Sequence, residues 1–263
     1  MITNTIETRR QRHHIGIATA ERNTGASAPS VPLRMKVLEG LAEEPARTPK
    51  RAASRRKGPA DKLYKIFEQQ HDSYLTRASL AKERHGFSVR RVSQELDPGG
   101  QSILSSISGN YLAKLKGITF GPPDINEALA KILTNISVSD DDLDLFNLHG
   151  QLVGIYVSAL VARCRAEDIL LLFLGEISPA YITYLGMRNT KHVVIDAEPN
   201  QLFYDLGYEM SCGSIELNGN AVIGVASDLA GGSITMNGHC DEHAGYGMKD
   251  GKLVVHGNVD DKL

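Results

Sequence analysis

The densest group of metal-competent side chains lies in one short stretch, His239-Cys-Asp-Glu-His243. A zinc site needs three or four such ligands converging on one point. The stretch lies between two apolar segments, where polar loop residues are common. We therefore predict no metal site and keep three weak candidates, His239, Cys240 and His243. No nucleophile elbow, P-loop or dinucleotide-binding fingerprint occurs, so we expect no catalytic residues, no cofactor and no catalytic activity of the chain's own.

A second set of residues has the chemistry to contact DNA. Ser106, Ser108 and Asn110 can hydrogen-bond to base edges, and asparagine is the residue type that reads adenine with two hydrogen bonds. The basic residues that would lie near phosphates are Arg90, Arg91, Lys114 and Lys116. The alternative is a helical adaptor with solvated basic residues. The charge of residues 61–150, 10 Lys and Arg against 12 Asp and Glu, favours that alternative.

These residues lie on a series of predicted short helices. Apolar residues at helical spacing predict one helix after Asp61 and a second towards Gly86, then helices at 88–96 and about 108–116. Another follows Asp124, a plausible N-cap, and an acidic turn or helix follows at 137–148, ending at Gly150. Residues 153–165 have the spacing of a further helix.

The stretch Ser108-Gly-Asn-Tyr-Leu-Ala-Lys-Leu-Lys-Gly117, with Gly-Pro-Pro-Asp124 and Glu127-Ala-Leu-Ala-Lys-Ile-Leu133 after it, resembles the helix-turn-helix domain of lambda-repressor/Cro-like (XRE) regulators. The resemblance covers roughly residues 73–150. It implies that the first stretch is a recognition helix lying in a major groove. The link from Asp97 to Ser106 is longer than in that family.

The last quarter of the chain repeats every 19 residues. The repeat glycines are Gly213, Gly219, Gly232, Gly238, Gly251 and Gly257. Between each pair, apolar residues alternate with polar ones, which is typical of a strand with one buried face. A fixed period of this kind predicts stacked coils of a parallel β-helix, with Ile215, Ile234 and Leu253 on one internal ladder. Glycine-rich hairpins are the alternative.

The segment Gly245-Tyr-Gly-Met-Lys-Asp-Gly251, followed by a strand and Gly257, resembles the glycine-repeat (GXGXG) β-helix at the C-terminal end of the large chain of glutamate synthase. The glycine-repeat chain of formylmethanofuran dehydrogenase is similar. The resemblance covers about Val193 to Leu263 and implies an architectural role without catalytic residues. We expect fewer than three full turns and an open end at Leu263 that meets another copy or a partner chain.

Charge is unevenly distributed along the 263 residues. Residues 1–60 hold 12 Lys and Arg against 5 Asp and Glu, whereas residues 151–263 hold 7 against 14. Five prolines interrupt the first segment, and its basic cluster at 51–57 could contact phosphate or could be a solvated linker. Three cysteines without a CxxC pair indicate a reducing compartment, so we expect a cytoplasmic protein. The longest apolar run, at 169–174, is too short to cross a bilayer, and we expect no membrane partner.

The sequence thus predicts an α+β protein in four parts. They are a disordered basic tail (1–60), a helix-turn-helix-like domain (61–150), a helical bridge (151–190) and a short right-handed parallel β-helix with 19-residue coils (191–263). We expect a protein that binds duplex DNA, resembles a transcriptional regulator, and forms homo-oligomers or docks a partner chain through the β-helix. The alternative is a non-catalytic structural component of a glutamate-synthase-like or formylmethanofuran-dehydrogenase-like complex.

Overall fold

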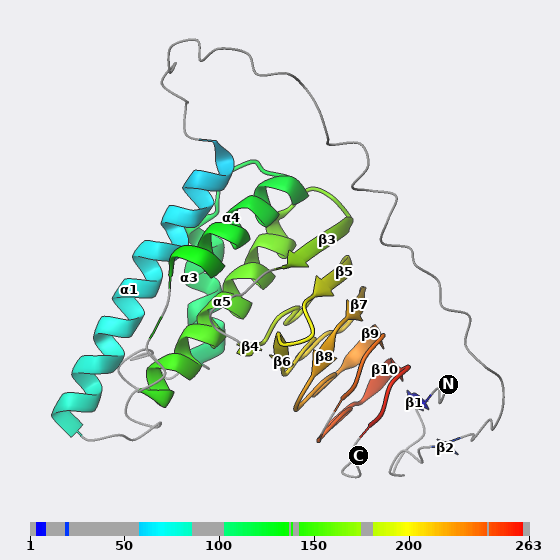
Figure 1. The fold of residues 1–263 in the computed structure, drawn as a ribbon. Helices are drawn as coiled ribbons and strands as arrows, with labels where there is room; N and C mark the ends of the chain where they lie inside the picture. Colours follow the sequence, from blue (N-terminus) through cyan, green and yellow to red (C-terminus); the bar gives the residue numbers. More distant parts are fainter. Residues whose placement is uncertain are drawn as a thin grey trace, which may run out of the picture.

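The computed structural model describes two strands at residues 4–8 and 19–20, together with residues 58–85, 103–136, 138, 142–174, 181–240 and 242–259. Most of the tail predicted at 1–60 lies outside these described residues. Within them the protein has four helices and a parallel β-solenoid of about 4 turns (Figure 1). The helices are α1 (Pro59–His85), α3 (Ile103–Lys114), α4 (Pro122–Asn135) and α5 (Leu143–Arg163).

The first helix is continuous where the sequence predicts two. The buried side chains Phe67, Tyr74 and Ala78 recur at helical spacing along α1 and face the other helices, so no break occurs between them. Leu80, near the end of α1, is 40% exposed. The helix predicted around Asp124 is present as α4, and Asp124 accepts a hydrogen bond from the backbone N–H of Gly121, which is itself the N-cap residue.

Helix α5 lies at the centre of the protein and is also longer than predicted. It continues through Gly150 and Gly154, so the predicted helix end at Gly150 is wrong, and the helix crosses the domain boundary placed there. A Cβ atom added to Gly154 would lie 2.0 Å from the carbonyl oxygen of Thr183, so this glycine marks a close contact between helix and solenoid. The length and apolar composition of α5 would also suit a membrane span, and most of the helix is buried inside the protein.

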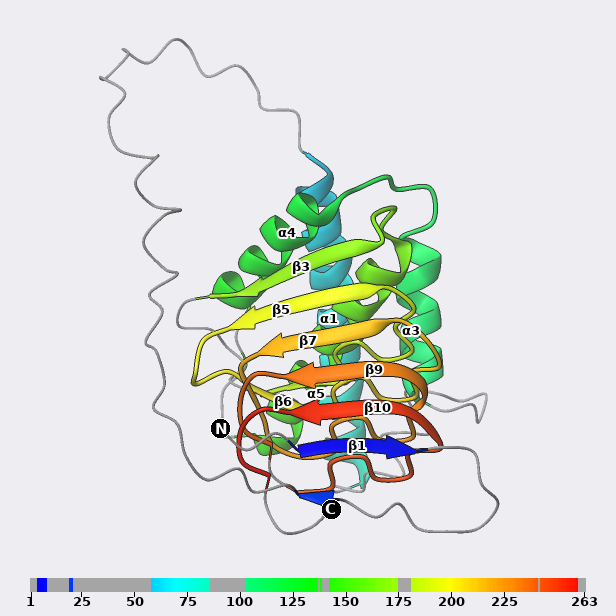
Figure 2. The ribbon, with the colours of Figure 1, turned by 90° about the vertical axis from the view of Figure 1, so that its right-hand side faces the viewer.

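The solenoid strands stack in two sheets. The larger sheet contains β3 (Asp168–Phe173), β5 (His192–Ala197), β7 (Ser214–Asn218), β9 (Ala230–Met236) and β10 (Asp250–Val255), all parallel (Figure 2). The smaller contains β4 (Tyr181–Thr183), β6 (Leu202–Tyr204) and β8 (Asn220–Ala221). The solenoid therefore begins before residue 191 and has more turns than the sequence predicts.

The predicted internal ladder is confirmed. Ile215 pairs in register with Ile234, and Ile234 with Leu253, and all three side chains are buried. Paired residues are 19 apart from β7 onward, except for a shift to 20 at Ala230 and Asp250, but Asp168 and His192 are 24 apart. The earlier coils carry longer loops, which conceals their period in the sequence.

A corner of the same geometry recurs in each coil. Three alternate residues of the corner have positive φ: Tyr184, Gly186 and Arg188; Asp205, Gly207 and Glu209; Gly224, Ala226 and Asp228; His243, Gly245 and Gly247. Non-glycine residues rarely adopt this conformation. Here hydrogen bonds to both neighbouring coils hold the corner, since Asp205 N–H donates to Ile223 O and Gly207 N–H to Leu185 O.

The repeat glycines have two different roles. Gly213 has a φ of 79°, and its equivalents in the next two coils are also positive. Gly238 instead permits close stacking, because an added Cβ would lie 2.0 Å from the carbonyl oxygen of Gly219. Only the first glycine of each pair that brackets a strand therefore supplies positive φ.

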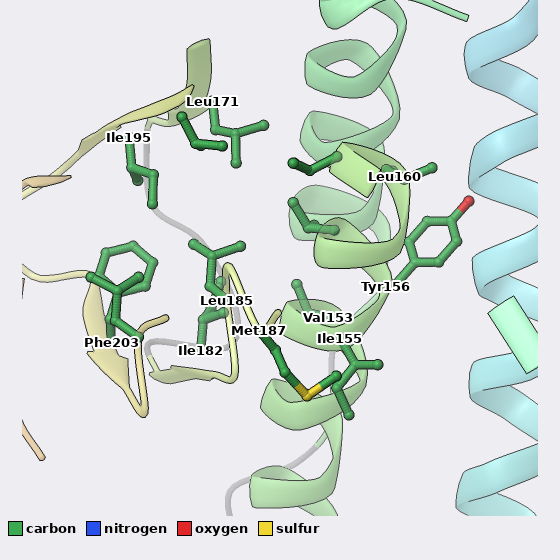
Figure 3. Packing of buried hydrophobic residues seen from close by; sticks show 14 of the residues in the cluster. Val153, Ile155, Tyr156, Leu160, Leu171, Ile182, Leu185, Met187, Ile195 and Phe203 are labelled. Atoms are coloured by element: carbon green, nitrogen blue, oxygen red, sulfur yellow. The ribbon is translucent and has the colours of Figure 1, made fainter. Parts of the chain in front are cut away.

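Helix α5 covers the first coil of the solenoid. The solenoid residues Leu171 and Leu185 lie on the side that faces α5, while Tyr156 of α5 points to the opposite side, towards α1 (Figure 3). Gly186 N–H donates to the hydroxyl of Ser158, fixing the helix against the first corner. These contacts make the helices and the first coil one continuous core.

Both outer strands of the parallel stack also have partners. The side-chain amide of Asn126 on α4 donates to Leu170 O and accepts from Leu172 N–H, as a neighbouring strand would for β3. At the other end, the backbone of β1 (Asn4–Thr8) pairs antiparallel with β10, and β2 (Thr19–Ala20) pairs with β1 (Figure 2). Pairing of outer strands satisfies backbone groups that would otherwise attract another sheet.

Candidate nucleic-acid interface

Helix α3 is held in place by the side chains of its inner face. Ile107, Tyr111 and Leu115 are buried, and the Tyr111 ring centre lies 4.7 Å from that of Tyr156 on α5. Burial raises the pKa of the Tyr111 hydroxyl well above its ordinary value, so the group stays neutral. Because this inner face is fixed, it determines which residues of α3 point outward.

The outward face of α3 brings together part of the predicted DNA-contacting set. At roughly 100° per residue, Ser106, Gly109, Asn110 and Ala113 form one stripe opposite the buried residues. Ser106 is half-buried and the other three are exposed. Ser108 lies on a flank, about 200° round the helix axis from Ser106, so it does not belong to this stripe.

Gly109 has no packing role among the described residues. A Cβ atom at this position would meet nothing within 4 Å. A glycine inside a helix costs roughly 0.5–1 kcal/mol relative to alanine, and nothing inside the described fold offsets that cost. Glycine is useful where a backbone must approach a ligand closely. The outward face of α3 therefore has room for a surface that comes close to the helix.

Asn110 retains the groups needed to read a base. Its side-chain amide donates one hydrogen bond, 2.8 Å long, to the hydroxyl of Tyr74 on α1. The second amide hydrogen and the carbonyl oxygen have no partner among the described residues. A bidentate contact with adenine needs one donor and one acceptor, so the hydrogen bond to Tyr74 orients the side chain without using up that capacity.

The charge near α3 is positive. No acidic residue occurs between Asp97 and Asp124, and Lys114 and Lys116 are both exposed. Two arginines from other elements approach the helix. Arg163 of α5 donates to Leu112 O at 3.3 Å, and Arg188 of the first corner donates to Ser105 Oγ at 3.3 Å while pairing with Glu209.

Sequence reasoning missed Arg163 and Arg188, because they lie far from α3 in the chain and only the fold brings them there. Conversely, Arg90 and Arg91 lie outside the described residues, as does the link before α3 up to residue 102. Whether these arginines flank the interface stays a prediction.

The weak metal candidates point in different directions. Cys240 is buried and forms a parallel bridge with Ala221 and Val259, whereas His239 and His243 are exposed. The Nδ1 atom of His239 accepts from the backbone N–H of Asn258. Across the described part of the chain, no group of three or more His, Cys, Asp or Glu side chains is placed to hold a metal ion.

Comparisons with protein-family models, with curated proteins and with solved structures gave no match to this sequence. The fold defines the class of the protein, a parallel β-solenoid whose first coil is covered by helices.

Proposed function

We propose that the protein binds duplex DNA through the outward face of α3 and acts as a transcriptional regulator of the helix-turn-helix type. The observation that carries the proposal is the composition of that face. It combines exposed Asn110 with a glycine that has no packing role among the described residues. Lys114 at the end of the helix and Lys116 just after it are exposed, and the helix carries no acidic residue. Such a face suits close approach to a groove and attraction to phosphates.

The solenoid would then serve as a rigid support for the helices. Arg188 on its first corner reaches Ser105 at the start of α3, and α5 joins the two parts through Ser158. Regulators of this type commonly bind as dimers to paired half-sites. We therefore propose a homo-oligomer on DNA, which analytical ultracentrifugation of the complex would measure.

The test is fluorescence anisotropy with labelled duplex DNA over a range of salt concentrations. The double variant Lys114→Ala with Lys116→Ala should bind more weakly to all sequences. Its plot of log K against log salt should be shallower by about 2, because each lysine–phosphate contact contributes about 0.9 to the slope. Asn110→Ala should instead reduce discrimination between sequences by about 1–3 kcal/mol.

The matched control is Lys249→Ala with Lys252→Ala, which removes the same charge near β10, far from α3 (Figure 1). It should bind nearly as well as the unmodified protein. Absence of DNA binding at low salt, or equal losses in the two double variants, would refute the proposal. Co-purification with a large oxidoreductase chain would then favour the alternative of a structural component in an enzyme complex.

A further inference from the structure

A cavity of about 460 Å³ lies where α5 meets the first two coils of the solenoid. One wall is formed by polar residues on successive turns of α5, Asn147 and Gln151. The opposite wall comes from β4, β6 and the corners that follow them. Its size is within the usual range for pockets that hold small molecules.

The solenoid wall is rich in tyrosine. Tyr181, Tyr184 and Tyr204 all line the cavity. The rings of Tyr181 and Tyr204 meet edge to face with centres 5.5 Å apart, and Phe146 supports Tyr181 from α5 at 6.1 Å. Faces of electron-rich rings attract cations through their quadrupole.

The cavity also contains one carboxylate, that of Asp205. Burial raises its pKa above the ordinary value for an aspartate. The pKa of Tyr184 is raised to about 12, mainly because the tyrosine is buried and secondly because the Asp205 carboxylate is negatively charged. Among the described residues no Lys, Arg or His pairs with Asp205, and no hydrogen bond reaches its side chain. A partly buried anion is costly unless a cation compensates it.

Two of these residues occupy strained backbone positions. Tyr184 and Asp205 are equivalent residues of successive corners, with φ of 66° and 47°, and the next two coils have Gly224 and His243 at this position. Glycine would fit each corner without strain. The two coils that line the cavity instead place a tyrosine and an aspartate at this positive-φ position.

We propose that this cavity binds a small protonated amine. The ammonium group would lie against the tyrosine rings with the Asp205 carboxylate as its counter-ion, and Asn147 and Gln151 would accept its remaining hydrogen bonds. The ligand would contact both the helices and the solenoid, so binding would stabilise their junction. This site is independent of DNA binding by α3.

The proposal is tested by titrating the whole protein with n-butylammonium and with 1-butanol, its neutral analogue, using calorimetry. The ammonium ion should bind at least about tenfold more tightly, as expected for a partly buried charge pair. Asp205→Asn should lose at least about tenfold in affinity for the ammonium ion. Its melting temperature without ligand should not fall, because the substitution removes an uncompensated charge and keeps the size of the side chain.

The matched control is Asp228→Asn. Asp228 lies in the following coil and outside the cavity lining. Like Asp205, it has a positive φ (54°), and its side chain lies beside a glycine of the next corner. It should bind the ammonium ion like the unmodified protein. Equal affinity for 1-butanol, unchanged affinity in Asp205→Asn, an equal loss in Asp228→Asn, or displacement of the amine by Mg²⁺ would each overturn the proposal.

Discussion

Replacing Gly154 with alanine tests whether α5 and the first coil are joined as tightly as the structure indicates. The new Cβ would lie 2.0 Å from Thr183 O and 2.9 Å from Thr183 C, both backbone atoms. Ordinary contact begins at 3.4 Å, so helix and strand would have to separate by about 1.4 Å. The Ser158 hydroxyl, one turn later, accepts from Gly186 N–H at 2.9 Å and opposes that movement.

The expected cost follows from these contacts. Overpacking a well-packed site costs roughly 1–3 kcal/mol, and a clash between two backbones belongs at the upper end. Alanine in place of glycine gains about 1 kcal/mol in helix propensity. We therefore expect Gly154→Ala to lower the free energy of unfolding by about 2 kcal/mol.

Gly109→Ala is the matched control, because it makes the same change in a helix where the new Cβ meets nothing within 4 Å. It should raise the free energy of unfolding by about 0.5–1 kcal/mol. Urea unfolding followed by circular dichroism measures both variants. Equal effects of the two substitutions, or a more stable Gly154→Ala protein, would refute the close contact between α5 and β4.

Two further predictions concern the aromatic core. Tyr111→Phe should leave the free energy of unfolding unchanged or raise it by up to about 1 kcal/mol, because the buried Tyr111 hydroxyl has no hydrogen-bond partner among the described residues. Tyr156→Phe should lower the free energy of unfolding by about 1 kcal/mol, because the Tyr156 hydroxyl donates to Leu63 O at 2.6 Å. Urea unfolding of both variants checks the two predictions. A Tyr156→Phe protein more stable than the Tyr111→Phe protein would contradict them. The second concerns His71, whose Nε2 lies 2.8 Å from His149 Nδ1. Burial lowers the pKa of His71 below its ordinary 6.5, although the carboxylate of Asp72 partly opposes this. As the pH falls through 6.5, the unfolded chain therefore binds the proton first, and the free energy of unfolding should decrease until the folded-state pKa is reached. Unfolding curves from pH 8 to pH 5 should show this loss, and His71→Asn should diminish it; an identical pH dependence in that variant would exclude His71 as the source.

The 19-residue repeat was enough to predict the internal ladder, because Ile215, Ile234 and Leu253 follow one another at constant spacing. The coil that begins with β3 was not predicted as solenoid, because its circuit is longer: Asp168 and His192 are 24 residues apart. Its corner nevertheless has Gly186 at the central positive-φ position that Gly207 and Gly245 occupy in later coils. Gly186 is therefore the local signal that could have revealed this coil.

A glycine also led to a wrong prediction of where a helix ends. Gly150 suggests a helix end in the sequence, but α5 continues through this position, where the glycine is buried. Apolar spacing alone does predict the inner face of α3 through Tyr111 and Leu115. The approach of Arg163 to that helix depends on tertiary packing and has no local sequence signal.

The constant register of the later coils has an evolutionary consequence. From Ser214 to Ser233, and again from Ser233 to Lys252, the chain makes one full circuit and returns to the equivalent place in the stack. Tandem duplication of one circuit in the gene would insert a new layer and lengthen the rod by about 4.8 Å. Neither the helices at one end nor the last layer at the other would need a new partner, so proteins of this architecture can vary in length in whole layers.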